Sequence, residues 1–162
     1  MNFAESFLKE FDPEMATTRK MLERLPESKL DWKPHPKSKS LGELAAHITE
    51  LPRFGLRIHE DTWNAGSEKA PPMKTAVEFL ARFDENVRES REAIAGMSDA
   101  DLDREFTVLR QGQVFFALKK RSVLRRVLLS HTIHHRGQLS VYLRLNDVAL
   151  PPVYGPTADE AM

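Results

Sequence analysis

Three histidines stand within five residues of one another in the last third of the chain, at His131, His134 and His135. In an α-helix, His131 and His135 differ by about 40° around the axis and lie one above the other. That spacing allows two imidazoles to bind one metal ion. His134 is three residues from His131 and could take the place of His135. The segment therefore predicts a helical metal-binding pair that includes His131.

A third imidazole comes from an earlier segment of the chain. His47 shares an apolar stripe of a predicted helix with Leu44 and Ile48, so it is expected to project into the core. Inward side chains from facing helices build metal sites in helical bundles, and three neutral imidazoles suit zinc, nickel, copper or iron. The alternative is that these are ordinary core histidines, each satisfied by a hydrogen bond.

The positions of His35 and His59 and the sequence of the HTIHH motif limit which residues could bind a metal and which reactions it could support. His35 lies in a predicted loop and His59 near a predicted helix end, so both are expected at the surface. The string HTIHH lacks the glutamate of the H-E-x-x-H zinc proteases, so a peptidase mechanism is not supported. The chain contains no cysteine, and any metal must therefore be held by nitrogen and oxygen atoms.

Long amphipathic stretches, separated by prolines, must position these histidines. Ser40 with Glu43, and Thr75 with Glu78, form capping-box signatures that begin helices. Pro52 is expected to bend the second helix midway, because proline removes a backbone donor. The predicted helices span residues 2–24 with a kink at Asp12-Pro13, residues 41–59, residues 75–96 closed by Gly96, and residues 122–145 capped by Ser122.

The connections and the tail complete the pattern. The proline-rich stretch 31–39 and the turn-rich stretch 64–72 are expected to be loops, and the tail 146–162 to lie irregularly on the surface. Residues 106–116 predict a short hairpin, with a helical turn or an irregular crossover as alternatives. Four helices with long crossover connections make an all-α four-helix bundle, which suits a single domain over residues 1–162.

Charge and hydropathy exclude several classes of partner. The 24 basic and 24 acidic side chains cancel, so no summed field would attract nucleic acid or an anionic membrane. The start, MNFAESFLKEFDPEM, has acids where a signal peptide would be basic and apolar, and no apolar run approaches ~20 residues. We therefore expect neither secretion nor a membrane span. The absence of cysteine is compatible with a reducing cytoplasm, which is the predicted location.

Five cations surround the predicted start of the last helix, which is the end where the helix dipole favours anions. One interpretation is a solvated face whose charges pair with acids elsewhere. The other is a seat for the anionic group of a substrate or thiol. These cations are Lys119, Lys120, Arg121, Arg125 and Arg126.

Side chains within one helical turn of the histidines are candidates to orient the imidazoles through hydrogen bonds. The alternative for each is a solvated or capping side chain. The candidates are Glu43, Glu50, Gln138 and Tyr142.

Three strings resemble the DinB-like superfamily of damage-inducible, YfiT-related proteins. They are LGELAAHITELPRF at residues 41–54, HTIHHRGQLSVYLR at residues 131–144 and PPVYGPTADE at residues 151–160. The resemblance implies a four-helix bundle with a long crossover connection, usually a homodimer. It also implies a metal held by one histidine of the second helix and the outer two of H-x-x-x-H. Carried over by position, these ligands are His47, His131 and His135, which leaves His134 without a metal role.

Several functions are compatible with such a site. We expect one divalent transition metal, with zinc or nickel preferred, and relatives include enzymes that use low-molecular-weight thiols, such as bacillithiol transferases and mycothiol-dependent isomerases. Three protein ligands leave a position open for water or substrate, as in catalytic sites. The prediction is a metal-dependent enzyme for a small-molecule substrate, either a thiol transferase or a hydrolase. The alternative is a non-catalytic metal-binding or stress-response protein.

Overall fold

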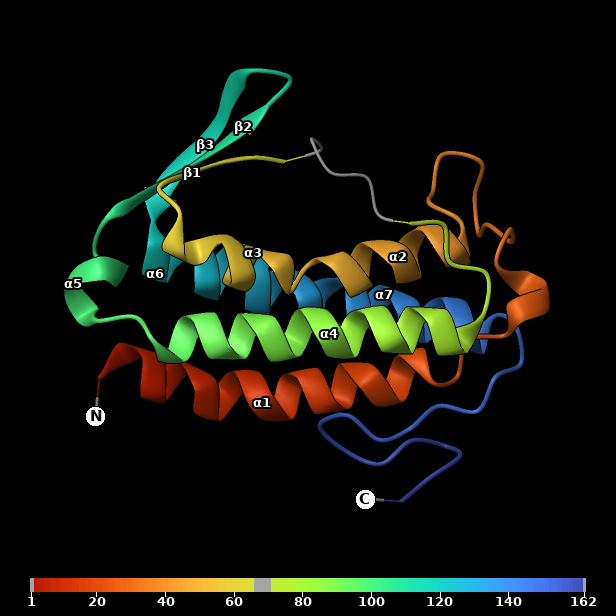
Figure 1. The fold of residues 1–162 in the computed structure, drawn as a ribbon. Coiled ribbons are helices and arrows are strands. Elements are labelled where there is room, and N and C mark those ends of the chain that lie inside the picture. The colour runs from red at the N-terminus through yellow and green to blue at the C-terminus, as the bar shows by residue number, and fades with distance from the viewer. Residues whose placement is uncertain (1, 66–70, 162) are drawn as a thin grey trace.

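The computed structural model describes residues 2–65 and 71–161 and is mostly helical (Figure 1). Three short helices and two single 3₁₀ turns join the longer elements. The longer helices are α1 (Phe3–Leu22), α2 (Leu41–Glu50), α4 (Ala76–Ala95), the π-helix η3 (Val123–Ser130) and α7 (His131–Arg144). The shorter ones are η1 (Glu27–Lys29), α3 (Arg53–Leu56), η2 (Arg57–His59), α5 (Asp99–Leu102) and α6 (Lys120–Ser122).

The predicted helix starts at the two capping boxes are confirmed. The Ser40 hydroxyl accepts from the Glu43 backbone N–H, and the Glu43 carboxylate accepts from the Ser40 N–H at 2.6 Å. Thr75 and Glu78 make the same reciprocal pair at the start of α4. The predicted Ser122 cap is wrong, because the backbone at Ser122 is already helical and its side chain makes no capping bond. The segment begins earlier, at Lys120.

Pro52 breaks the second helix instead of bending it, so α2 ends at Glu50 rather than continuing to His59. Two buried polar side chains of α4 satisfy carbonyl groups at the break. Asn86 Nδ2 donates to the Thr49 carbonyl at 2.9 Å, and the Ser90 hydroxyl donates to the Pro52 carbonyl. These bonds hold the broken segment against α4, and a separate helix, α3, follows. By contrast, α1 runs through Pro13 without a break.

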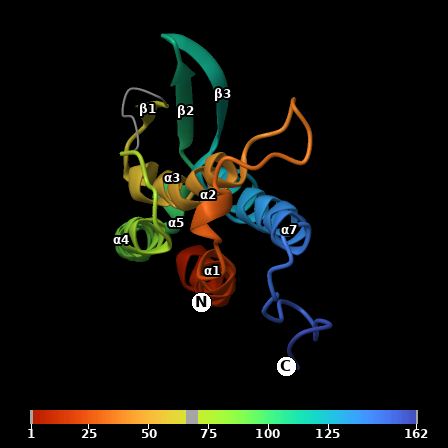
Figure 2. The same ribbon diagram turned by 90° about the vertical axis from the view of Figure 1, so that its right-hand side faces the viewer.

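Four helical rods surround a common apolar core (Figure 2). α4 packs against α1, α2 and α3, while α7 packs against α1 and α2. Apolar side chains at helical spacing build this core, among them Phe7 and Phe11 of α1 and Phe79 and Phe83 of α4. The predicted four-helix arrangement therefore holds for the helical part. None of the described helices has the length and apolarity needed to cross a membrane.

The prediction of a purely α fold is wrong, because a three-stranded sheet projects from one end of the bundle (Figure 1). β2 (Glu105–Arg110) and β3 (Gln113–Lys119) form the hairpin that was the first interpretation of this segment. Positive φ angles at Gln111 and Gly112 give the two-residue turn that matches strand twist. β1 (Thr62–Asn64) adds in parallel to β2 from a segment for which no strand was predicted. Phe106 and Val108 of β2 are buried and belong to the hydrophobic core.

The predicted irregular tail is confirmed, and side chains anchor it across the bundle. Arg24, two residues after the end of α1, pairs with Glu160 at 2.5 Å, and Arg144 of α7 pairs with Asp159. The tail therefore lies against α1 and α7. Of the predicted turn-rich stretch 64–72, residues 66–70 lie outside the described residues.

Candidate metal centre

The Nε2 atoms of His47, His131 and His135 point at one position between α2 and α7. His131 Nε2 lies 2.8 Å from His135 Nε2 and 3.4 Å from His47 Nε2. One ligand atom from each of the three rings lies within 4.8 Å of the other two. The predicted convergence of these three histidines is therefore observed.

Local sequence rules place each ring. The capping box sets the start of α2, which puts His47 beside the buried residues Leu44 and Ile48 on the face turned to the bundle interior. His131 is the first residue of α7, and His135 follows one turn later. Because α2 packs against α7, the helix pair brings together rings separated by more than eighty residues.

Hydrogen bonds at the outer ring nitrogens determine the tautomers of the α7 histidines. His135 Nδ1 donates to Gln138 Oε1 at 2.7 Å, which leaves a lone pair on His135 Nε2. The His131 ring hydrogen-bonds to the Val127 backbone. Because His131 Nε2 faces the other imidazoles, the ring atom that bonds to Val127 is Nδ1. The Val127 carbonyl can only accept, so Nδ1 carries the proton. Both rings thus present Nε2 lone pairs to each other.

The environment also favours neutral imidazoles. Burial, followed by the charges of His135, His131 and Lys39, lowers the pKa of His47 from 6.5 to about 4. Burial is also the main cause of the lowered pKa values of His131 and His135. Neutral imidazole is the form that binds transition metals, so this cluster is ready to bind one at neutral pH without losing a proton.

These donor atoms fit a metal ion. Two lone pairs facing each other at 2.8 Å repel, and protonation of either ring is disfavoured by the lowered pKa. A cation between them removes the repulsion. Nitrogens bound to one zinc ion at about 2.0–2.1 Å lie about 3.3 Å apart in a tetrahedral arrangement. The 3.4 Å between His47 and His131 matches this separation, and the 2.8 Å between His131 and His135 is shorter. The three histidines could therefore hold one metal ion.

One side of the cluster opens into a hollow of about 220 Å³. His135 and Gln138 form its wall on the α7 side, and Leu44 lines it from α2. Ser38, Lys39 and Tyr142 complete the lining. Of the three histidines, His135 is the one that lines this hollow.

The remaining histidines lie outside the cluster. His134 is exposed and contacts only the edge of the His135 ring, with centroids 4.9 Å apart. His35 and His59 are also exposed, as predicted. The structure therefore brings His135, and not His134, together with His47 and His131.

Of the four side chains expected to orient the imidazoles, Gln138 does so. Glu43 instead caps α2 and pairs with Lys33 at 3.4 Å. Glu50 pairs with Arg53 and Arg82 on the side of α2 that faces α4. Glu43 thus follows the capping alternative, and the Glu50 carboxylate is engaged by interhelical partners instead of an imidazole. Tyr142 lines the hollow, and its hydroxyl donates to the Lys39 carbonyl at 3.3 Å.

Four of the five cations in residues 119–126 are paired with acids on other elements. Lys119 and Arg121 both bind Asp103, and Arg125 binds Glu10 of α1. Lys120 is fully buried, and its Nζ lies 3.0 Å from Asp61. This arrangement agrees with the predicted paired face and leaves the anion-seat alternative without support at these four side chains.

Two residues near the site were not predicted from the sequence. Lys39 lines the hollow and directly precedes Ser40, the cap residue of α2. The prolines of residues 31–39 predicted a loop, but no functional residue was predicted there. Arg136 is 2% exposed, and its Nη1 lies 2.7 Å from Glu14 of α1, while its Nη2 donates to the Tyr154 hydroxyl. The sequence signal for this buried ion pair is the position of Arg136, directly after His134 and His135.

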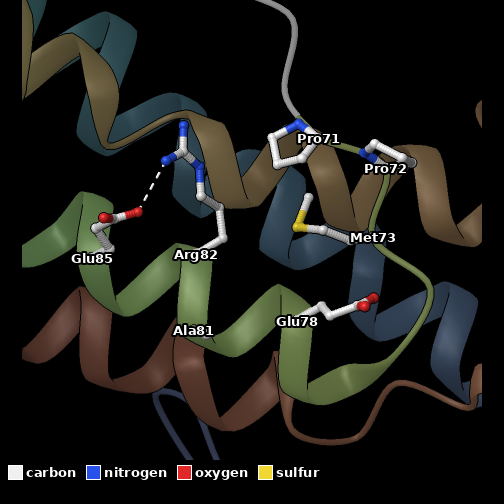
Figure 3. Close-up of a pocket in the computed structure, with 7 residues that line it drawn as sticks. All are labelled: Pro71, Pro72, Met73, Glu78, Ala81, Arg82 and Glu85. Carbon is white, nitrogen blue, oxygen red and sulfur yellow. Dashed lines mark hydrogen bonds and ion pairs between the residues drawn. The ribbon is translucent and has the colours of Figure 1, made fainter.

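A larger hollow of about 560 Å³ lies between the segment Pro71–Met73 and α4 (Figure 3). Its charged side chains are already engaged. Arg82 binds Glu50 and Glu85, and Glu78 accepts the backbone N–H groups at the start of α4. No histidine lines it, so the chemistry of the metal centre belongs to the smaller hollow.

Comparison with known proteins places the chain in a family. The protein YrdA of Bacillus subtilis is 25% identical over 156 residues, covering 96% of this chain and 90% of that protein. A crystal structure of a DinB-like protein from Bacillus cereus superposes with a TM-score of 0.74, at 25% identity, over 93% of this chain and 97% of that one. A DinB-like protein from Bacillus subtilis gives 0.72, at 21% identity, over 92% and 96%. Residues 10–139 match the DinB superfamily. The chain therefore belongs to the DinB superfamily.

Proposed function

We propose that His47, His131 and His135 bind one divalent transition-metal ion, with zinc or nickel preferred, and that the protein is a metal-dependent enzyme for a small-molecule substrate. The observation that carries this proposal is the convergence of three Nε2 atoms beside a hollow. Among the described residues, no cysteine, aspartate, glutamate or further histidine joins the cluster as a fourth ligand. Three protein ligands with an open side are typical of catalytic sites, whereas structural sites are closed.

The preferred reaction class is transfer to or from a low-molecular-weight thiol. A bound divalent ion lowers the pKa of a coordinated thiol or water and so supplies a nucleophile at neutral pH. The chain contributes orientation, because Gln138 holds the His135 ring in place. It also contributes a lined space for the substrate, since Leu44 and Tyr142 border the hollow with apolar surface. Hydrolysis by metal-bound water is the alternative.

Metal analysis of protein purified without an affinity tag tests the first part, and we expect close to one transition-metal ion per chain. Cobalt substitution then tests the open side. A thiol that enters the metal shell should change the d–d spectrum and add a sulfur-to-metal charge-transfer band. If azide or imidazole perturbs the spectrum and thiols do not, hydrolysis becomes the better proposal. If no small ligand perturbs it, the site is closed and the non-catalytic alternative gains support.

We also propose a homodimer, as the family resemblance implies. A two-fold interface between bundles would place the same surface of both chains in contact. Val141 and Leu145 of the α7 segment are large apolar side chains that remain more than half exposed in the single chain. Light scattering at micromolar concentration should report twice the chain mass, and a monomer would contradict the proposal.

A further inference from the structure

The hollow beside His135 is lined by both polar and apolar side chains and by one cation. Leu44 and the Tyr142 ring provide the apolar surface, and Lys39 provides the charge. Its volume of about 220 Å³ equals the liquid volume of about seven water molecules. The space therefore suits a short organic molecule or the end of a longer one.

Lys39 has no ion-pair partner in the described part of the chain. The acid nearest in sequence, Glu43, is bound by the Ser40 N–H and by Lys33. This contrasts with residues 119–126, where four of five cations face a carboxylate. Lys39 nevertheless lines the same hollow as His135, which is one of the three histidines.

The loop that carries Lys39 is held in position from two sides. The Tyr142 hydroxyl donates to the Lys39 carbonyl, and the Trp32 ring packs edge-on against Tyr142 with centroids 5.6 Å apart. The first N–H groups of α2 are already used, since Leu41 N donates to the Trp32 carbonyl at 2.9 Å. A Cβ on Gly42 would lie 3.1 Å from the Leu30 carbonyl oxygen, so the loop and α2 fit closely. The cation is thus presented by a preorganised backbone, and the helix start has no free donors for an anion.

We propose that this hollow binds a small organic carboxylate, whose carboxylate group pairs with Lys39 while its other end reaches the position between the three histidines. The inference rests on the proposed function, and it assigns the substrate class of that site. Tyr142 is a positioning residue that holds the Lys39 backbone. The apolar walls accept the methylene groups between the two ends of the ligand.

Titration of the cobalt-substituted protein tests this assignment. The probes are 3-mercaptopropionate and its neutral analogue 3-mercaptopropionamide, followed through the d–d and charge-transfer bands at one fixed pH. Lys39→Met keeps the apolar stem and removes the charge. We expect it to weaken binding of the acid about 2- to 5-fold, the range for losing an ion pair of an exposed side chain, and to leave binding of the amide unchanged.

Lys37→Met is the matched control, because Lys37 lies two residues away in the same loop and does not line the hollow. It should leave both probes unchanged, and Lys39→Arg should retain the preference for the acid. Equal weakening of both probes by Lys39→Met, or no weakening, overturns the assignment of Lys39 while the proposed function stands. Failure of both probes to bind the wild-type protein also overturns the carboxylate assignment. Failure of the protein to bind cobalt overturns the proposed function itself.

Discussion

The helical segment from Lys120 to Arg144 carries two stretches of polar side chains that differ in their partners. The cations of the first stretch are paired with carboxylates, and the histidines of the second are not. In residues 120–125, Lys120, Arg121 and Arg125 each meet a carboxylate from another element. Six residues after Arg125, His131 and His135 face each other through nitrogen lone pairs without a counter-charge. A run of charge is therefore no sign of a ligand when the fold supplies its partners. Donor atoms that converge without such partners indicate a ligand site.

The largest effect should follow from removing a converging donor. His131→Ala deletes the ring whose Nε2 lies closest to both other donors, and we expect bound metal to fall close to zero per chain. Inductively coupled plasma analysis of purified protein measures it. His134→Ala is the matched control on the same turn and should retain the metal, because its exposed ring lies outside the cluster. Metal loss in His134→Ala alone would reverse the ligand assignment.

The next effect concerns a charge in the histidine stretch that does have a partner. Arg136 is buried and lies 2.7 Å from Glu14, whose side chain is 15% exposed, so Arg136→Met should destabilise the protein by up to about 3 kcal/mol by leaving the carboxylate with the Tyr154 hydroxyl but no cation. Urea unfolding measures the change. Arg144→Met, which breaks the exposed pair with Asp159, should cost much less. Equal losses in the two variants would mean that burial does not distinguish these ion pairs.

A smaller effect is expected at the bond that orients a donor. Gln138→Leu removes the acceptor from His135 Nδ1, and metal affinity should fall about 10- to 100-fold because the ring and its tautomer are no longer held. Competition with a chromophoric chelator gives the affinity. Ser140→Ala lies on the same helix and bonds only to the Gly137 carbonyl, so it should leave affinity unchanged. Unaltered affinity in Gln138→Leu would remove this residue from the site.

The pH dependence of the metal-free protein should reveal the cost of burying His47. Its pKa is about 4 in the folded chain and 6.5 when unperturbed, so the unfolded state binds more protons between these values. Stability is then at its full value above about pH 6.5 and falls as pH drops towards 4. With a chelator present, unfolding measured across this range should show a shallower fall for His47→Gln. Identical slopes for the two proteins would contradict the lowered pKa.

The smallest effect should come from the paired cations. Arg125→Ala combined with Arg126→Ala breaks the exposed contact with Glu10, and we expect the free energy of unfolding to change by no more than about 1 kcal/mol. Metal content and binding of 3-mercaptopropionate should not change. If binding of 3-mercaptopropionate weakened and binding of its neutral amide did not, the anion-binding site would lie at Arg125 and Arg126. The paired cations would then take part in ligand binding as well.

Local sequence rules predicted the parts of the site that depend on near neighbours. Ser40 and Glu43 begin α2 as expected, and His47 follows on its apolar face. His131 and His135 lie one turn apart on α7, also as expected. The same rules failed at Pro52, because Asn86 and Ser90 of a different helix satisfy the carbonyls at the break and make a clean interruption stable. They failed again at Thr62–Asn64, whose strand exists only because β2 lies beside it.

The sequence by itself determined the donor types, the absence of thiolate ligands, the spacing of the histidines and the start of the helix that carries His47. Each of these follows from residue identity or from contacts within one helical turn. Only the tertiary structure decided which cations have partners, that Lys39 lies at the same hollow as His135, and that Glu50 turns away from the histidines. Those outcomes join residues far apart in the chain, and packing of whole helices, not local preference, sets which distant side chains meet.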